Sequence, residues 1–220
     1  MTVKSPYTAA NLAICDPELT LTVPPSVTAA TGVDALTHAI EGYTVVNAEP
    51  IGDAAALYAI ELIYQHLQEA FEHGDHLEAR SAMLVGSMLG GISFSHSDVG
   101  GVHCIAEALG SIYDLPHGTC CAIFLPYLME YNMDYCREKY ARIAAAMGFS
   151  YETAEEGARI AVEKIKQLTI DVKLPSFASL RVDPKDFPRL AEMAYQNGSN
   201  ASNPRPLEVE DYIKYNFPNQ

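Results

Sequence analysis

The sequence lacks several features that would place the chain in particular protein classes. No run of about 18 uninterrupted apolar residues is present to cross a bilayer, and residues 1–6 lack the apolar core of a secretory signal. Lysine and arginine number 14 against 28 aspartates and glutamates, and the basic residues form no cluster. A formal charge of −14 repels phosphate backbones. We therefore expect a cytoplasmic protein with neither a membrane nor a nucleic acid as partner.

Paired cysteines are also missing. The five cysteines are odd in number and form no C-x-x-C motif, and 220 residues with 49% hydrophobic composition can bury a core without disulfides. We expect reduced thiols. Cys120 follows His117 by three residues, a spacing that could place both side chains on one helix face as zinc ligands. Cysteines that simply pack in the core are more common on helices, so we favour a packing role for Cys120.

Alternating strand patterns are scarce, whereas from Ser26 onward apolar residues recur every three or four positions, which predicts a mainly helical fold. Ser26 offers a hydroxyl to cap the first helix. The expected helices cover residues 26–46, 53–72, 75–94, 102–112, 117–131, 137–147, 153–168, 185–197 and 207–215. Residues 12–15 are short, apolar and followed by prolines, which predicts a strand and an extended connector. A lone strand leaves backbone groups unpaired, which indicates a missing sheet.

Asp34 and His38 are candidate metal ligands on the first long helix. They stand four residues apart, so both side chains project from one face about one turn apart. At this spacing an exposed hydrogen-bonded pair is more common than a chelate. The neighbours are apolar, however, and a buried carboxylate needs a charge partner or a metal. These neighbours are Val33, Ala35, Leu36, Ala39 and Ile40.

His103 and His117 are the other two candidates. A Gly100-Gly101 entry precedes the helix that carries His103, and Pro116-His117-Gly118 opens the next one. Their imidazoles could converge across this helix–turn–helix. Taken singly, a hydrogen-bonded core histidine and a histidine at a helix start are both commoner than ligands, so spacing alone leaves the alternatives open.

Long ordered motifs resemble the signatures of the iron-containing alcohol dehydrogenase family. D-P-E-L-T-L-T-V-P-P at residues 16–25 is followed by T-G-V-D-A-L-T-H-A-I-E at residues 31–41. A second signature runs from Gly101-Val-His103 through L-P-H-G at residues 115–118 to A-I-F-L-P at residues 122–126, and N-P-R-P-L at residues 203–207 is similar to the family's usual C-terminus. The resemblance covers nearly the whole chain.

The resemblance implies a dehydroquinate-synthase-like fold, the multi-helix C-terminal domain of this family, with a short N-terminal β remnant. Residues 1–24 would be the remnant of a nucleotide-binding domain with its connector, and residues 25–220 the helical metal-binding domain. In the family one aspartate and three histidines hold a divalent metal. By motif position these are Asp34, His38, His103 and His117.

The implied cofactors are Fe²⁺, or Zn²⁺ or another divalent metal, together with NAD(P). A nitrogen-rich site with one carboxylate suits these metals and leaves a position open for an alcohol or carbonyl oxygen. The metal would act as a Lewis acid, and hydride would pass to or from the nicotinamide. The resemblance thus implies a metal-dependent alcohol dehydrogenase or aldehyde reductase acting on a small alcohol or aldehyde.

The chain departs from the family because it has no G-x-G-x-x-G or comparable glycine-rich turn after a strand, so cofactor-binding residues remain unknown. Metal binding is better supported than catalysis. Two alternatives stay open: a catalytically incomplete metal-binding or oligomerising protein, and a truncated reading frame. An unpaired strand edge and an uncovered cleft would favour a homodimer or larger assembly.

Three further residues are candidates. Many relatives carry a histidine one turn after the position of His103, where this chain has Glu107. Glu107 is predicted to move a proton or to orient a metal-bound imidazole, and the alternative is an ordinary solvated glutamate. Phe94 and His96 are substrate-pocket candidates, because relatives have substrate-facing residues near this stretch.

Overall fold

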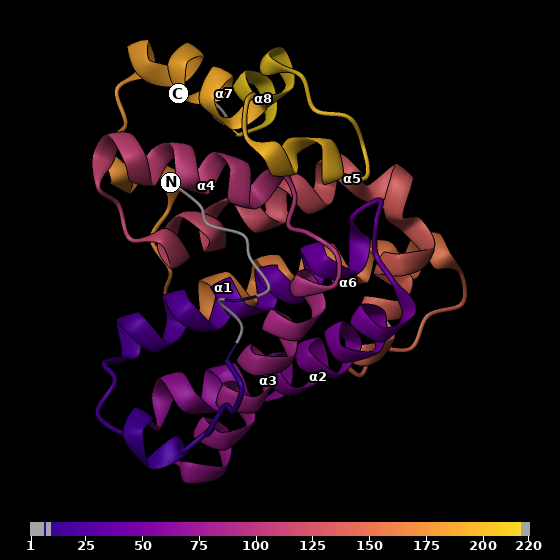
Figure 1. The fold of residues 1–220 in the computed structure, drawn as a ribbon. Coiled ribbons are helices and arrows are strands. Elements are labelled where there is room, and N and C mark those ends of the chain that lie inside the picture. The colour runs from indigo at the N-terminus through magenta and orange to yellow at the C-terminus, as the bar shows by residue number, and fades with distance from the viewer. Residues whose placement is uncertain (1–6, 8–9, 217–220) are drawn as a thin grey trace.

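The computed structural model describes residue 7 and residues 10–216. Helices dominate the fold, as the apolar spacing predicts, and the described residues contain no strand (Figure 1). The α-helices are α1 (Pro25–Thr44), α2 (Pro50–Glu72), α3 (Leu77–Ser95), α4 (Gly101–Tyr113), α5 (His117–Ala146), α6 (Ala154–Asp171), α7 (Phe187–Tyr195) and α8 (Val209–Asn216). Short 3₁₀ turns lie at Pro17–Thr20, Phe177–Leu180, Pro184–Asp186 and Gly198–Ser202.

The strand predicted near residues 12–15 is wrong. This segment has no regular structure, and Leu12 and Ile14 are 77% and 80% exposed. Asp16 then starts the first 3₁₀ turn by accepting a hydrogen bond from the N–H of Glu18 at 3.0 Å. A short apolar run becomes a strand only beside a partner strand, and the described residues supply none. Residues 1–6 and 8–9 of the expected N-terminal remnant lie outside the described residues.

One further expectation, about the start of the first helix, is wrong. Ser26 does not cap α1, because the helix starts one residue earlier: Pro24 is the N-cap and Pro25 the first helical residue. Proline suits that position since its φ is already helical and no N–H is lost. The helices expected at residues 117–131 and 137–147 are both present and adjoin within α5, which is kinked between the two ranges at Cys136 (φ −119°, ψ 15°).

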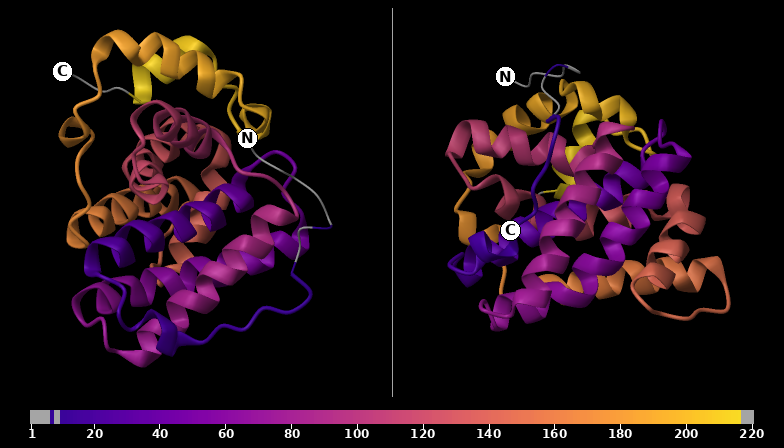
Figure 2. Two further views of the ribbon diagram at one scale, coloured as in Figure 1. Left: turned by 60° about the vertical axis from the view of Figure 1, so that its left-hand side comes forward. Right: turned by 60° about the horizontal axis from the view of Figure 1, so that its bottom comes forward.

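Helix α1 lies at the centre of the fold. It packs against α2 and α3 on one side and against α5 on the other, while α6 packs on α5 (Figures 1 and 2). The C-terminal helices α7 and α8 cover α4 and the adjoining part of α5. Leu36, Ile40 and Tyr43 of α1 are fully buried, and each such side chain contributes about 1.5–3 kcal/mol to the free energy of unfolding.

Gly118 lets α5 begin in direct contact with α1. A Cβ at this residue would lie 2.8 Å from the carbonyl oxygen of Ala30 and 3.3 Å from the Cβ of Asp34. The backbones of α1 and α5 therefore approach more closely than any larger residue would allow. This contact brings the start of α5 next to the middle of α1. Within the described part of the chain, no helix is both long and apolar enough to span a membrane.

Candidate metal centre

Three helices bring four potential ligand atoms together. Asp34 lies in the middle of α1, His103 in the first turn of α4, and His117 begins α5, with Cys121 one turn later. The chain reverses between α4 and α5 at Asp114, which is left-handed (φ 52°), and only three residues separate the two helices. One ligand atom from each of the four residues lies within 4.8 Å of the others.

The individual distances are close to what a shared metal ion requires. His117 Nε2 lies 3.7 Å from Asp34 Oδ1, and His103 Nε2 lies 4.0 Å from the same oxygen. Cys121 Sγ lies 3.5 Å from His117 Nε2. His117 is the most open of these residues, with 44% of its side chain exposed against 19% for Asp34 and 5% for His103. The group is thus partly buried and most accessible beside His117.

Two unsatisfied polar atoms show that this group fits a cation. Asp34 Oδ1 and His103 Nε2 are both buried and have no hydrogen-bond partner in the structure. Such atoms are rare, because burying an unpaired polar group costs about 1–3 kcal/mol. Both point into the same space, where a divalent metal would satisfy them. Carboxylate oxygen and imidazole nitrogen are ordinary ligands of Zn²⁺ and Fe²⁺.

His38 lies beside the group of four rather than in it. Its ring stacks on Phe94, with centroids 4.7 Å apart, and its centroid is 4.5 Å from that of His103. Burial, together with the charge of His103, lowers the pKa of His38 to about 4, although Asp34 and Glu41 oppose the shift. The ring is therefore neutral near pH 7, the form that a metal ligand must take.

Glu41 is a functional side chain that the sequence reasoning did not single out. Its Oε2 lies 2.6 Å from His103 Nδ1, and its Oε1 accepts a hydrogen bond from the N–H of Val102 at 2.8 Å. Burial lowers the pKa of His103, but the hydrogen bond and charge of Glu41, with the charges of Asp34 and Glu107, outweigh it and leave that pKa raised. Its position three residues after His38, on the same helix face, is the signal that could have identified it.

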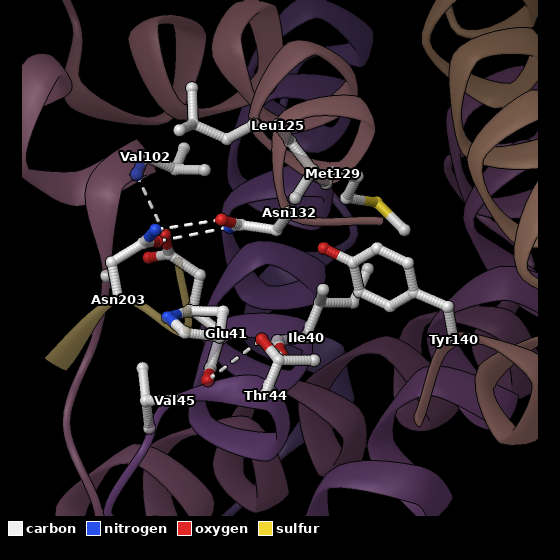
Figure 3. A pocket seen from close by; sticks show the side chains of 13 residues that line it. Ile40, Glu41, Thr44, Val45, Val102, Leu125, Met129, Asn132, Tyr140 and Asn203 are labelled. Atoms are coloured by element: carbon white, nitrogen blue, oxygen red, sulfur yellow. Dashed lines mark hydrogen bonds between the residues drawn. The ribbon is translucent and has the colours of Figure 1, made fainter. Parts of the chain in front are cut away.

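The start of α4 is fixed by side chains around a small cavity. Asn203 Oδ1 accepts from the N–H of Gly101 at 3.2 Å, and Asn203 and Asn132 exchange hydrogen bonds through their amides at 2.8 and 3.1 Å (Figure 3). With Glu41, these contacts satisfy the N–H groups of Gly101 and Val102 in the first turn, where His103 lies. The cavity next to Glu41 measures about 10 Å³, room for about one water molecule.

The remaining candidates lie around this centre. Glu107 is exposed, and its Oε2 accepts a hydrogen bond from Asn197 Nδ2 at 2.8 Å. Phe94 covers one face of His38, whereas His96 is exposed at the end of α3. Cys120 is buried in the core, and burial raises the pKa of its thiol to about 11, which agrees with the packing role favoured for it.

Known proteins are similar to this chain in sequence. Residues 28–215 match the family described as Fe-containing alcohol dehydrogenase family, C-terminal. The choline dehydrogenase of Bacillus subtilis (strain 168) is 42% identical over 209 residues, which are 94% of this chain and 52% of that protein. The 1,3-propanediol dehydrogenase of Citrobacter freundii is 42% identical over 198 residues, 89% of this chain and 51% of that protein.

Solved structures of alcohol dehydrogenases and related enzymes are similar to this chain in fold as well. A 1,3-propanediol oxidoreductase superposes with a TM-score of 0.88 at 40% identity, covering 90% of this chain and 53% of the other. An alcohol dehydrogenase from Oenococcus oeni superposes with a TM-score of 0.87, with the same identity and coverage. These likenesses confirm the predicted helical domain. The chain spans about half the length of the curated relatives it matches.

Proposed function

The chain belongs to the Fe-containing alcohol dehydrogenase family, and from this membership we propose that it supplies the metal-binding domain of an NAD(P)-dependent alcohol dehydrogenase or aldehyde reductase. The observation that carries the proposal is the pair of buried, unpartnered atoms Asp34 Oδ1 and His103 Nε2, which face each other across the same space. A domain with no metal to bind has no reason to keep a carboxylate and an imidazole in that state.

We propose Asp34, His38, His103 and His117 as the metal ligands. When bound, a divalent metal supplies a Lewis acid for an alcohol or carbonyl oxygen, and a nicotinamide supplies or takes the hydride. The protein's own contribution is positional. Glu41 fixes the ring of His103, Phe94 covers the ring of His38, and the exposed edge of His117 leaves access for a small molecule.

The activities named for relatives support an alcohol or aldehyde as substrate. They include an NAD-dependent methanol dehydrogenase from Bacillus methanolicus and a lactaldehyde reductase from Escherichia coli (strain K12). A sulfoacetaldehyde reductase from Bifidobacterium kashiwanohense, 26% identical, was solved in complex with NAD⁺. A small primary alcohol or its aldehyde is therefore the substrate class that we propose, with a nicotinamide as the hydride carrier.

Glu107 is proposed as a proton-transfer group at the edge of the centre. It follows His103 by one helical turn, and its exposed carboxylate already forms a hydrogen bond with Asn197. An exposed carboxylate can exchange protons with water, whereas buried Glu41 has both oxygens occupied by His103 and Val102. Glu107→Gln should lower turnover without changing metal content, and Glu163→Gln, on α6, serves as the surface control.

The proposal is tested first by metal content. Protein purified without oxygen should hold about one Fe²⁺ or Zn²⁺ ion per chain, and His103→Ala and His117→Ala should fall to background in elemental analysis. Unchanged metal content in both variants would refute the ligand assignment. Metal-loaded protein is then mixed with NADH or NADPH and a panel of short aldehydes, and nicotinamide absorbance is followed.

A second function would explain a different outcome of that assay. The chain lacks the glycine-rich nucleotide motif and spans about half of its relatives. Bound metal without turnover or nicotinamide binding would favour a metal-binding or oligomerising module. Self-association is expected in either case, because Ile51, Tyr58 and Leu77 are exposed on α2 and α3, and light scattering measures it directly.

A further inference from the structure

Arg80, near the start of α3, is a buried arginine that pairs with no acidic side chain of the described residues. It is only 4% exposed. Its guanidinium donates to the carbonyl of Gly74 at 2.8 Å, to Thr28 Oγ1 at 2.7 Å and to the carbonyl of Val23 at 3.1 Å, and all three acceptors are neutral. Burial lowers the pKa of Arg80, but an arginine stays charged near pH 7. A buried charge without a counter-charge is unfavourable, so this place lacks one negative group.

A cavity of about 140 Å³ adjoins this guanidinium, where the segment before α1 meets α1 and α3. Thr28 is buried at its inner end, beside Arg80, whereas Thr31 and Ser87 are exposed where it opens. The volume exceeds the roughly 10–15 Å³ that one water molecule needs, and it is below the roughly 300 Å³ at which pockets for larger organic ligands begin. The cavity therefore suits a small polyatomic ion.

The charge of the cavity wall is unusual for this protein. Among the described residues that line the cavity, Arg80 is the only charged one, in a chain whose formal charge is −14. An anion is repelled by most of such a surface and attracted here, because the nearest full charge is positive.

The cavity also offers hydrogen-bond donors. A guanidinium has five N–H groups, and the described residues accept from three of those of Arg80, so two remain. Thr28 Oγ1 accepts from Arg80 and keeps its own proton to donate, and Ser87 adds a hydroxyl at the opening. The hydroxyl of Thr31 is used, since it donates to the carbonyl of Val27 at 2.8 Å. Guanidinium N–H groups bind oxyanions more strongly than neutral oxygens.

We propose that this cavity binds a small tetrahedral oxyanion, of the size and charge of inorganic phosphate, on Arg80 and Thr28. The anion supplies the missing negative charge and fastens the segment before α1 to α3. None of the four proposed metal ligands lines the cavity, so the anion site goes beyond the proposed function and does not depend on it.

A purely structural role for Arg80 is the alternative. Its three hydrogen bonds already tie Val23 and Thr28 to α3. Replacing Arg80 removes these bonds in either case, so the decisive variant must keep the guanidinium. Ser87→Glu does so: it adds a carboxylate from an exposed position at the opening, which repels an entering anion and takes up part of its space.

The test is equilibrium dialysis of the full chain with radiolabelled inorganic phosphate, in EDTA and chloride buffer at constant ionic strength. Wild type should bind about one phosphate per chain with a Kd below about 1 mM. Ser87→Glu should bind at least about 10-fold more weakly. Ala145→Glu, which adds the same charge at an exposed position of α5, and His117→Ala, which alters the metal centre, should bind as wild type does. Circular dichroism establishes that the variants are folded.

Each failure is separate from a failure of the metal centre. Wild type that binds no phosphate at about 10 mM leaves Arg80 a structural residue and overturns the anion site. Unchanged affinity in Ser87→Glu, or an equal loss in Ala145→Glu, also overturns it, because binding is then insensitive to charge at this cavity. Loss of binding in His117→Ala places the phosphate at the metal centre instead. Metal content, measured without phosphate, tests the proposed function on its own.

Discussion

Glu41 holds His103 through a 2.6 Å contact between its Oε2 and the Nδ1 of the imidazole, and thereby directs Nε2 at Asp34. The other oxygen of the same carboxylate, Oε1, accepts a hydrogen bond from the N–H of Val102. A carboxylate at Nδ1 keeps the proton on that nitrogen, which leaves Nε2 free to bind a metal. One buried residue on α1 therefore contacts the start of α4 and orients the imidazole that we propose as a metal ligand.

This relationship predicts the effect of Glu41→Gln. The glutamine oxygen can still accept from Val102, but its amide group then faces Nδ1 as a donor. His103 must shift its proton to Nε2, the atom that faces Asp34. We expect Zn²⁺ affinity to fall by about 10–100-fold in isothermal titration calorimetry.

Glu130→Gln is the control for this change, because Glu130 forms only a surface ion pair with Lys166 at 3.4 Å. Such a pair contributes less than about 1 kcal/mol and lies away from the ligands. The Glu130→Gln variant should bind Zn²⁺ with the same affinity as wild type. Equal affinity in Glu41→Gln as well would show that Glu41 does not orient the ligand.

Gly118 provides a test of the contact between α1 and α5. A Cβ at this residue would approach the carbonyl oxygen of Ala30 to 2.8 Å, so Gly118→Ala must push the two helices apart. We expect the free energy of unfolding to fall by about 1–3 kcal/mol in urea titrations, and metal affinity to fall too because Asp34 and His117 separate.

Gly91→Ala is the matched glycine substitution. Gly91 lies inside α3, and a Cβ there would meet nothing within 4 Å. Alanine favours the helix, so this variant should be as stable as wild type or up to about 1 kcal/mol more stable. If both variants were destabilised alike, the loss would not come from the contact with α1.

The apolar spacing in the sequence predicts the helices well, because nearly all of them bury one face against α1 or α5. It fails at residues 12–15, where a strand would need a partner that the described residues do not contain. The same limit applies to the site. Motif order suggests Asp34, His38, His103 and His117. Which side chains face these residues, Glu41 and Cys121 among them, depends on how α4 and α5 pack against α1, and spacing along the chain does not give that packing.

Asn203 illustrates this limit further. In the sequence it is part of a proline-rich C-terminal motif with no evident chemistry, and it is 100 residues away from the histidine it helps to place. In the structure it accepts from Gly101 at the start of α4 and pairs with Asn132 of α5. Contacts of this kind follow only from the packed fold.

The cysteines should differ sharply in reactivity. All five are free, as predicted from their number and spacing, but only Cys15 is partly exposed. Burial raises the pKa of Cys136 to about 12 and that of Cys120 to about 11, so their thiols stay protonated and inert near pH 7.

Ellman's reagent should therefore react rapidly with about one thiol in native protein and with all five in denaturant. Cys15→Ser should remove the rapid phase, and a rapid phase that persists would contradict the buried placement of the others.

Metal removal should lower the free energy of unfolding by an amount that depends on the free metal concentration and the dissociation constant. An ion that binds only the native state, at a free concentration 100 times its dissociation constant, adds about 2.7 kcal/mol to the free energy of unfolding. For a domain of this size that raises Tm by roughly 5–10 °C. Adding EDTA to Zn²⁺-loaded protein should reverse the rise in Tm, as measured by differential scanning calorimetry.

His117→Ala, which removes the most exposed proposed ligand and little packing, should melt near the Tm of metal-free wild type, and Zn²⁺ should not raise its Tm. A Zn²⁺-dependent rise of equal size in His117→Ala would place the ion elsewhere on the protein.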